Sequence, residues 1–200
     1  MSNVRFLMTQ SLLAAWQYQY QAQDQEAAHR DFLKTLNREP IQPNKAMLDG
    51  IQFENMVTAY CEGNPPREDH EWLEGIKGVG DRVRGCQFQV AAYREIVVGK
   101  VPFLLYGRLD GLRAGNIFDI KFSRTYQPGK YLGSPQHPMY FCCVPEAKRF
   151  DYVVYTGSDV CVESYRPGEG EPAEQTVRQF MGYLEETGLA PVYIEKWRAK

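Results

Sequence analysis

The segment of residues 107–123, GRLDGLRAGNIFDIKFS, carries the side chains best suited to chemistry in this 200-residue chain. The glycine near its centre predicts a tight turn at Ala114-Gly115 between two strands. A turn centred there places Asp110 opposite Asp119, with their Cβ atoms about 4.5–5.5 Å apart on one face of the sheet. Lys121, two residues beyond Asp119, points to that same face. Two carboxylates and an ammonium group are therefore expected to converge on one small patch.

Carboxylates that lie directly opposite each other in a sheet repel, so folding alone does not favour this placement. A bound Mg²⁺ or Mn²⁺ would reverse the effect, because a hard cation takes oxygen ligands and is commonly held by one or two carboxylates. A metal held in this way polarises a phosphoryl oxygen and lowers the pKa of the attacking water. Lys121 would orient that water or stabilise the charge that develops on the phosphate. The alternative is an exposed hairpin face on which Lys121 forms a surface salt bridge with an aspartate.

The two strands resemble the PD-(D/E)XK nuclease superfamily, and within it the RecB-like, Cas4-like and phage exonuclease-like branch. That branch has a glycine-hydrophobic-Asp strand, a hairpin and an Asp-hydrophobic-Lys strand, matched here by Gly107-Arg108-Leu109-Asp110 and Asp119-Ile120-Lys121. An upstream helix of the family carries a glutamate, which Glu54 matches. A downstream helix carries Gln-x-x-x-Tyr, which Gln136 and Tyr140 match. The four motifs occur in the family's order, over about residues 45–165.

The resemblance assigns roles to the residues of the metal site. Asp110 and Asp119 would be metal ligands, and Glu54 would be a further ligand or the base. The carbonyl of Ile120 would be another ligand, and Lys121 would orient the water. A solvated helix glutamate is the alternative for Glu54.

Other residues would contact the substrate. The resemblance places Gln136 and Tyr140 against it, although Tyr140 is also compatible with a plain core aromatic. Arg108 and Arg124 flank the hairpin and would bind phosphates independently of base sequence, or else form a solvated basic edge. In the loop after Arg124, Tyr126 and Tyr131 would either stack on unpaired bases or pin the loop to the core.

The order of the elements predicts an α/β fold with a central mixed β-sheet flanked by helices. By resemblance this is a restriction-endonuclease-like core. Helices are expected over residues 12–23 (capped by Thr9 or Ser11), 26–36, 45–61, 68–76, 136–143 and 173–186. Strands are expected over residues 87–98, 101–112, 117–122, 150–156 and 160–165, with Phe118, Ile120 and Phe122 facing the core. The chain is interpreted as one domain: an N-terminal helical segment (1–44), the nuclease core (45–165) and a C-terminal helix and tail (166–200).

Two local patterns support further expectations. In the helix over residues 45–61, an apolar face would be formed by Met47, Ile51, Met56, Val57 and Tyr60. The glycine-rich stretch 75–82, GIKGVGDR, is interpreted as a turn between a helix and a strand. It also resembles the hairpin of helix-hairpin-helix DNA-binding motifs, whose glycines let backbone amides approach phosphate.

Composition excludes several classes of protein. No apolar stretch approaches the roughly 18–20 residues that span a bilayer, and no signal peptide is evident, so we expect a cytoplasmic protein of a bacterium or a phage-infected cell. The five cysteines have no CxxC spacing and do not match the iron–sulfur spacing of some family members, so we expect free thiols and no iron–sulfur cluster. The net charge of −2 argues neither for nor against nucleic acid.

The resemblance implies a metal-dependent deoxyribonuclease, and more narrowly an exonuclease in phage or bacterial recombination and repair. Its partner would be DNA. A homo-oligomer is compatible with the family, and because no helicase motifs are present, any recombination or helicase partner would be a separate chain. The alternative is a catalytically inactive protein of the same fold that binds DNA or a protein partner.

Overall fold

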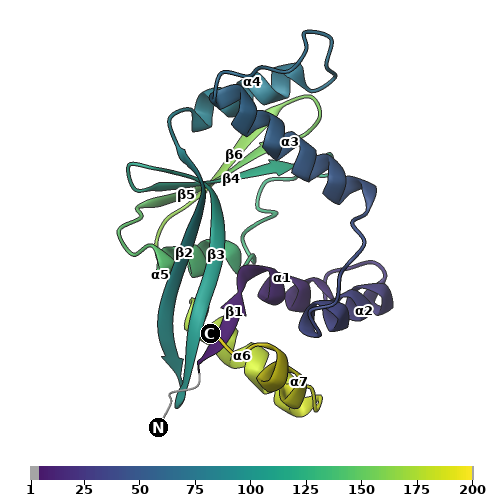
Figure 1. Cartoon of the computed structure of the whole chain (residues 1–200), viewed down its shortest axis with the longest axis vertical. Helices are drawn as coiled ribbons and strands as arrows, with labels where there is room; N and C mark the ends of the chain where they lie inside the picture. Colours follow the sequence, from purple (N-terminus) through teal and green to yellow (C-terminus); the bar gives the residue numbers. More distant parts are fainter. Residues whose placement is uncertain (1–4, 200) are drawn as a thin grey trace.

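The computed structural model describes residues 5–199 and contains a six-stranded mixed sheet with helices packed on both faces (Figure 1). The strands follow the order β1-β3-β4-β5-β6, and β2 pairs with the other edge of β3. The pairs β1–β3 and β4–β5 are parallel, whereas the others are antiparallel. The expected α/β class is confirmed, and the arrangement fits a restriction-endonuclease-like core. The strands are β1 (Phe6–Thr9), β2 (Gln87–Val98), β3 (Val101–Arg113), β4 (Asn116–Phe122), β5 (Arg149–Tyr155) and β6 (Val160–Tyr165).

Helices α2, α3, α5 and α6 lie where they are expected, and α3, α5 and α6 have the expected bounds. The helix expected over residues 68–76 instead spans Leu73–Val83, and the one expected over residues 12–23 ends at Tyr18. The first helix begins earlier than expected, where the side chain of Thr9 accepts a hydrogen bond from the Leu12 N–H at 3.2 Å. Pro138 is tolerated because it lies in the first turn of α5. The helices are α1 (Gln10–Tyr18), α2 (Gln25–Leu36), α3 (Lys45–Cys61), α4 (Leu73–Val83), α5 (Gln136–Cys143), α6 (Ala173–Glu186) and α7 (Ala190–Lys196).

Three apolar clusters hold the layers together. Helices α3 and α4 pack on one face of β4 and β5, where Phe118 and Ile120 are buried as expected. Helix α5 packs on the opposite face, against Ile117 and Tyr152. The third cluster joins α1, α2, α6 and α7 to β1 and to the part of the β2–β3 hairpin next to its turn. Because successive side chains of a strand point to opposite faces, Asp119 and Lys121 lie on the face that α5 covers, and Phe118 and Ile120 lie on the face that α3 and α4 cover.

The glycine-rich stretch is neither a turn nor a DNA-binding hairpin, because residues 75–82 all lie within α4. The glycines permit close packing of this helix. A Cβ on Gly75 would lie 2.6 Å from the ring of Tyr155, and a Cβ on Gly80 would overlap the ring of Tyr60. Local sequence suggested a turn, but tertiary packing accounts for these glycines.

The apolar face expected for α3 is partly wrong. Phe53 and Val57 are fully buried, whereas Met47 and Ile51 are 48% and 53% exposed. The reason is that only the C-terminal half of α3 crosses α4 and the sheet, so the apolar residues of its first two turns meet no packed neighbour.

Strand β1 and helix α7 were not expected from the sequence. Strand β1 has four residues, too few for a periodic pattern to be recognised, and it forms only by parallel pairing with β3. All five cysteines are free thiols. Within residues 5–199, no helix has the length and apolar character required to cross a membrane.

Candidate active site

The site lies where β3 and β4 separate. The two strands pair only at Arg113–Asn116, Leu112–Ile117 and Gly111–Phe118, in the expected register. Beyond these pairs β4 continues along β5, and the free edge of β3 is taken by β1 at residues 103–106. Asp110 and Asp119 are the first residues past the last pair. The divergence leaves a gap in the sheet into which polar side chains can project.

Asp110 and Asp119 are not a ladder pair, which corrects the expected direct opposition. Instead, Oδ2 of Asp110 accepts a hydrogen bond from the backbone N–H of Ile120 at 2.8 Å. The carboxylate thus takes the place of a backbone carbonyl as the acceptor for this strand amide, because the backbones have already moved apart. The core-facing side chain of Ile120 is 5% exposed, and the role of its carbonyl as a metal ligand stays a prediction.

Asp119 is the most deeply buried charge of the site, at 2% exposure. Its Oδ1 accepts a hydrogen bond from the side-chain amide of Gln136, at the first residue of α5. Its Oδ2 lies 2.6 Å from Nζ of Lys121 in an ion pair. Both oxygens of Asp119 therefore have a protein partner, one an amide and the other an ammonium group. A buried carboxylate of this kind supplies the oxygen ligands that a hard cation prefers.

Lys121 points to the same side as Asp119, as the alternation of β4 predicts. Burial opposes its charge, but the carboxylates of Asp119 and Asp110 outweigh that effect and raise the pKa of Lys121. Its side chain keeps one third of its surface exposed. Lys121 is thus a permanent cation that is held beside Asp119 and still reaches solvent.

Glu54 projects from α3 toward the same charges. Its carboxylate accepts a hydrogen bond from the side-chain amide of Gln89 in β2. Burial raises the pKa of Glu54 and the Gln89 hydrogen bond lowers it. The charge of Asp119 also raises it, and those of Lys121 and Arg108 lower it. The tertiary structure therefore brings the helix glutamate to the strand aspartates.

Gln89 is a site residue that the sequence reasoning missed. Its backbone has φ of 56°, an uncommon left-handed conformation for a residue other than glycine, near the start of β2. The β2–β3 register pairs Val90 with Leu109 and Phe88 with Gly111, so Gln89 lies opposite Asp110. The turn at residues 99–100 would have placed it there from the sequence. A strained residue at this point is typical of functional sites.

Neighbouring carboxylates disfavour the ionised forms of Asp110 and Glu54. Burial, with the charges of Asp119 and Glu54, raises the pKa of Asp110 well above its usual value, although Lys121 and the Ile120 N–H act in the opposite direction. A divalent cation would relieve this repulsion. In the part of the chain that the structure describes, no three ligand-type side chains already form a metal-binding cluster. Each carboxylate is held by its own protein donor, so a cation would draw the side chains together.

Helix α5 braces the site. The hydroxyl of Tyr140 donates a hydrogen bond to the backbone carbonyl of Arg108 at 3.0 Å, and the ring is 3% exposed. A Cβ on Gly107 would overlap the Tyr140 ring, so the glycine allows α5 to approach β3. Tyr140 is thus a buried positioning residue, whereas Gln136 contacts Asp119 directly.

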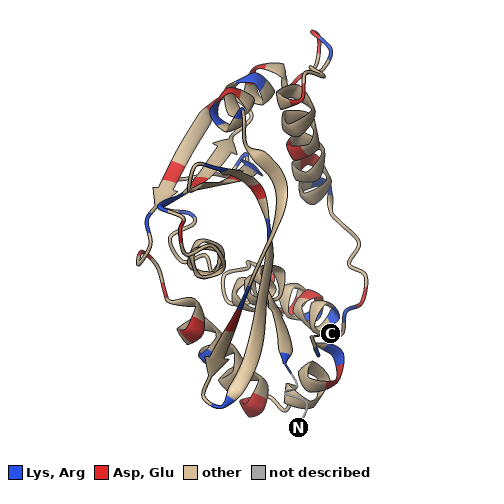
Figure 2. Cartoon of the chain, turned by 60° about the vertical axis from the view of Figure 1, so that its left-hand side comes forward, with Lys and Arg blue, Asp and Glu red and all other residues tan. Residues whose placement is uncertain are grey.

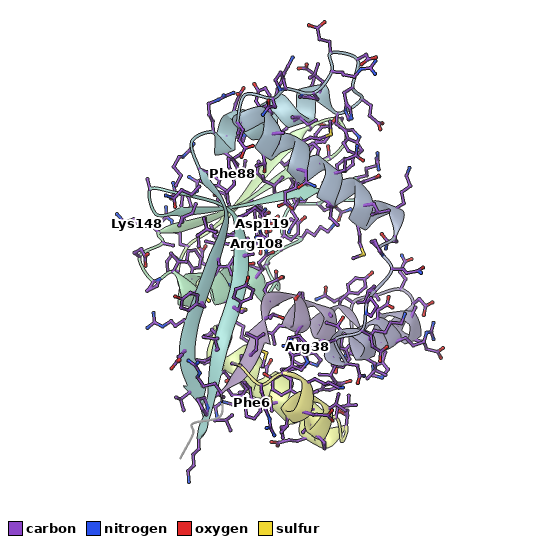
Figure 3. The ribbon with its side chains drawn as sticks, viewed as in Figure 1. Phe6, Arg38, Phe88, Arg108, Asp119 and Lys148 are labelled. Atoms are coloured by element: carbon purple, nitrogen blue, oxygen red, sulfur yellow. The ribbon has the colours of Figure 1, made fainter. Side chains whose placement is uncertain are left out.

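The two arginines differ in position. Arg108 is exposed, and its charge acts on Glu54; Figure 3 labels it near Asp119 at the centre of the molecule. Arg124 pairs with Asp49 of α3 at 3.2 Å, and its guanidinium lies 4.6 Å from the ring centroid of Phe122, on the α3 face. The contacts of Arg124 do not bring it to the carboxylates. In the view of Figure 2, acidic and basic segments are interspersed along the chain.

The aromatic residues of the β4–α5 loop pin it to the core. The ring of Tyr131 stacks on Tyr152 with centroids 4.2 Å apart, and the hydroxyl of Tyr126 donates to Glu163 at 2.9 Å. Glu163 also accepts the backbone N–H of Tyr131 at 3.1 Å. His137 is fully buried and stacks on Tyr165, and burial lowers its pKa to about 4. A neutral, enclosed histidine is a core residue.

Comparisons with known proteins indicate the fold and no more. No protein-family model matches the chain, and no curated protein matches it either. The structure is similar to the crystal structure of a protein designated SSO0001, with a TM-score of 0.53 and 17% sequence identity over 91% of this chain and 77% of that chain. At this identity the similarity concerns the arrangement of helices and strands alone.

Proposed function

We propose that the chain is a metal-dependent nuclease that hydrolyses DNA phosphodiester bonds with Mg²⁺ or Mn²⁺. The observation that carries the proposal is the ion pair between buried Asp119 and Lys121 at the separation of β3 and β4, with Asp110 and Glu54 close enough for their charges to interact with it. The PD-(D/E)XK resemblance of these residues is consistent with the same chemistry.

The burial of Asp119 argues against the simpler explanation of a surface salt bridge. An exposed pair between long side chains would contribute about 0–1 kcal/mol to folding and would need no further partners. Asp119 is instead 2% exposed, and the carboxylate of Asp110 nearby repels it. Apolar side chains at these two positions would not repel each other. An arrangement that costs stability is expected where it serves a ligand or a reaction.

The proposal gives each of these residues a role. Asp110 and Asp119 would hold the divalent cation, with Glu54 as a further ligand or as the base. The bound cation supplies Lewis acidity toward the phosphoryl oxygen and lowers the pKa of the attacking water. Lys121, held by Asp119, would orient that water or stabilise charge on the phosphate.

The surrounding residues would position the catalytic groups and the substrate. Gln136 fixes Asp119 and Gln89 fixes Glu54, while Tyr140 holds β3 through the Arg108 carbonyl. The exposed side chain of Arg108 would contact a phosphate of the strand. An exonuclease of bacterial or phage recombination and repair, alone or beside a separate helicase or recombination chain, is the context that the family resemblance favours.

A second candidate is an inactive protein of the same fold that binds DNA or a protein. One observation favours it: Glu54, Asp110 and Asp119 are each already engaged by a protein hydrogen-bond donor. Such contacts would stabilise the carboxylates without any cation. A binding protein would retain affinity for its partner in the absence of metal.

The test is cleavage of end-labelled linear and circular DNA with Mg²⁺, with Mn²⁺ and with EDTA. Lys121→Ala should abolish cleavage, because the water loses its orienting ammonium. Lys148→Ala, which removes an exposed lysine next to the β3–β4 turn that Figure 3 labels to the left of Asp119, should cleave like the wild type. Sparing of circles would identify an exonuclease. If neither wild type nor Lys121→Ala cleaves single- or double-stranded DNA with either metal, the second candidate function, an inactive binding protein, is favoured.

A further inference from the structure

A cavity of about 500 Å³ opens between α1 and the loop that joins β4 to α5. Its volume falls within the range of about 300–1,000 Å³ that is typical of small-molecule sites. The lining combines aromatic rings with amide, hydroxyl and ammonium groups, a mixture suited to a flat ligand that carries polar edges and an anion. The polar and aromatic residues that line it are Gln17, Tyr18, Gln21, Lys130, Tyr131 and Ser134.

The cavity adjoins the candidate active site. Burial raises the pKa of Tyr131 to about 12, and Lys121 and Asp119 lie near enough for their charges to lower and raise it, respectively. On the same wall, the hydroxyl of Ser134 accepts the backbone N–H of Gln136 at 3.2 Å, and the Gln136 side chain donates to Asp119. A ligand in the cavity would therefore contact Tyr131 and Ser134, which connect the cavity wall to the groups around Asp119.

Lys130 supplies a cation without an anionic partner. Its ammonium donates to the hydroxyl of Ser123 at 2.7 Å and reaches that of Thr125 at 3.5 Å. Among the residues 5–199 described, it forms no ion pair with a carboxylate. An ammonium group at the wall of a cavity beside a phosphodiesterase-type site is complementary to a phosphate.

The rings supply a surface for a base. Tyr18, the last residue of α1, is 60% exposed, so its ring is free to take a partner. Tyr131 on the opposite wall is fixed by its stacking on Tyr152. Any of the bases can stack on such rings, and the side-chain amides of Gln17 and Gln21 can hydrogen-bond to the edge of the stacked base.

We infer that this cavity is a subsite for one unpaired nucleotide of the substrate strand, with the base against Tyr18 and Tyr131 and a phosphate at Lys130. The inference rests on the proposed function and specifies its substrate as a strand with an unpaired end. A base inside the cavity has to leave its duplex, which costs unpairing energy. Single-stranded or frayed ends are therefore bound in preference to closed duplex.

The experiment measures binding of a fluorescein-labelled single-stranded oligothymidylate by anisotropy, in EDTA so that no cleavage occurs. Tyr18→Ala should weaken binding about tenfold, the loss typical of one stacked base. Tyr20→Ala is a matched control, because Tyr20 is 59% exposed in the same stretch of chain but lies outside the cavity. Lys130→Met should weaken binding and make the affinity less dependent on salt concentration, by the amount expected for the loss of about one phosphate contact. Lys148→Met should change neither the affinity nor its salt dependence.

The outcomes separate this inference from the proposed function. If wild type binds the oligonucleotide and only Tyr18→Ala and Lys130→Met lose affinity, the subsite is established, whether or not the chain cleaves DNA. If both variants bind like the wild type while Lys121→Ala abolishes cleavage, the subsite is refuted and the nuclease stands. Absence of any binding by wild type in EDTA, or equal losses in the two control variants, would also overturn the subsite. Thermal melting of each variant verifies folding.

Discussion

The side-chain amide of Gln89 donates a hydrogen bond to the carboxylate of Glu54, and so links the strained first part of β2 to helix α3. This contact opposes burial, which raises the pKa of Glu54. Gln89→Gly keeps the left-handed backbone without strain and removes the side chain that carries the amide, so the hydrogen bond can be tested apart from the backbone conformation.

The first prediction is that Gln89→Gly raises the pKa of Glu54, because a hydrogen bond that favours the ionised carboxylate is lost. If ionised Glu54 is the ligand or base, activity falls on the acid side of its pKa. The acid limb of the kcat/KM profile should then move to higher pH, with the plateau nearly unchanged. Superimposable pH profiles for wild type and Gln89→Gly would show that this contact does not tune the site.

The second prediction concerns stability without metal. The pKa of Asp110 is raised by burial and by neighbouring charges, and a carboxyl with a raised folded-state pKa destabilises the fold as pH rises above its unfolded value. Asp110→Asn should therefore raise the free energy of unfolding at pH 7 by about 0.5–2 kcal/mol, and the gain should shrink toward pH 4. Urea unfolding in EDTA measures it.

Asp151→Asn is the matched control for that experiment. Asp151 is also buried, but it pairs with Arg149 at 2.6 Å and accepts from Ser164 at 2.7 Å, so its charge is compensated. Its neutralisation should lower stability. A loss of stability in Asp110→Asn comparable to that in Asp151→Asn would contradict the repulsion inferred at the site.

The third prediction is that Mn²⁺ or Mg²⁺ raises the melting temperature of the wild type, because a ligand that binds only the folded state stabilises it. For a chain of this length, each kcal/mol of binding corresponds to about 2–4 °C. Asp110→Asn and Asp119→Asn should lose this response, and Asp151→Asn should keep it. A shift that persists in Asp110→Asn and Asp119→Asn would place the cation elsewhere.

The fourth prediction tests the approach of α5 to β3. Gly107→Ala would drive a methyl group into the Tyr140 ring and displace the helix that carries Gln136. We expect a destabilisation of about 1–3 kcal/mol, typical of overpacking, together with reduced activity. Gly182→Ala in α6 has open space around its Cβ and should instead be neutral or stabilising by up to about 1 kcal/mol. Calorimetry of both variants distinguishes packing from a general intolerance of glycine replacement.

Local patterns in the amino-acid sequence determine much of the site. The register about Ala114-Gly115 and the alternation of β4 place Lys121 beside Asp119 and turn Ile120 toward the core, because turn position and a two-residue period are properties of a short segment. The bounds of α3, α5 and α6 follow in the same way from apolar spacing and helix-terminating residues.

Long-range packing decides the rest. The separation of β3 from β4 depends on β1 and β5, which lie far away in the sequence, so the loss of direct opposition between Asp110 and Asp119 is invisible in the hairpin alone. The glycines of α4 suggest a turn when they are considered without the rings of Tyr155 and Tyr60 that press against them. The contact between Gln89 and Glu54, and separately the cavity beside Tyr131, form only in three dimensions, because side-chain contacts between distant segments carry no local pattern.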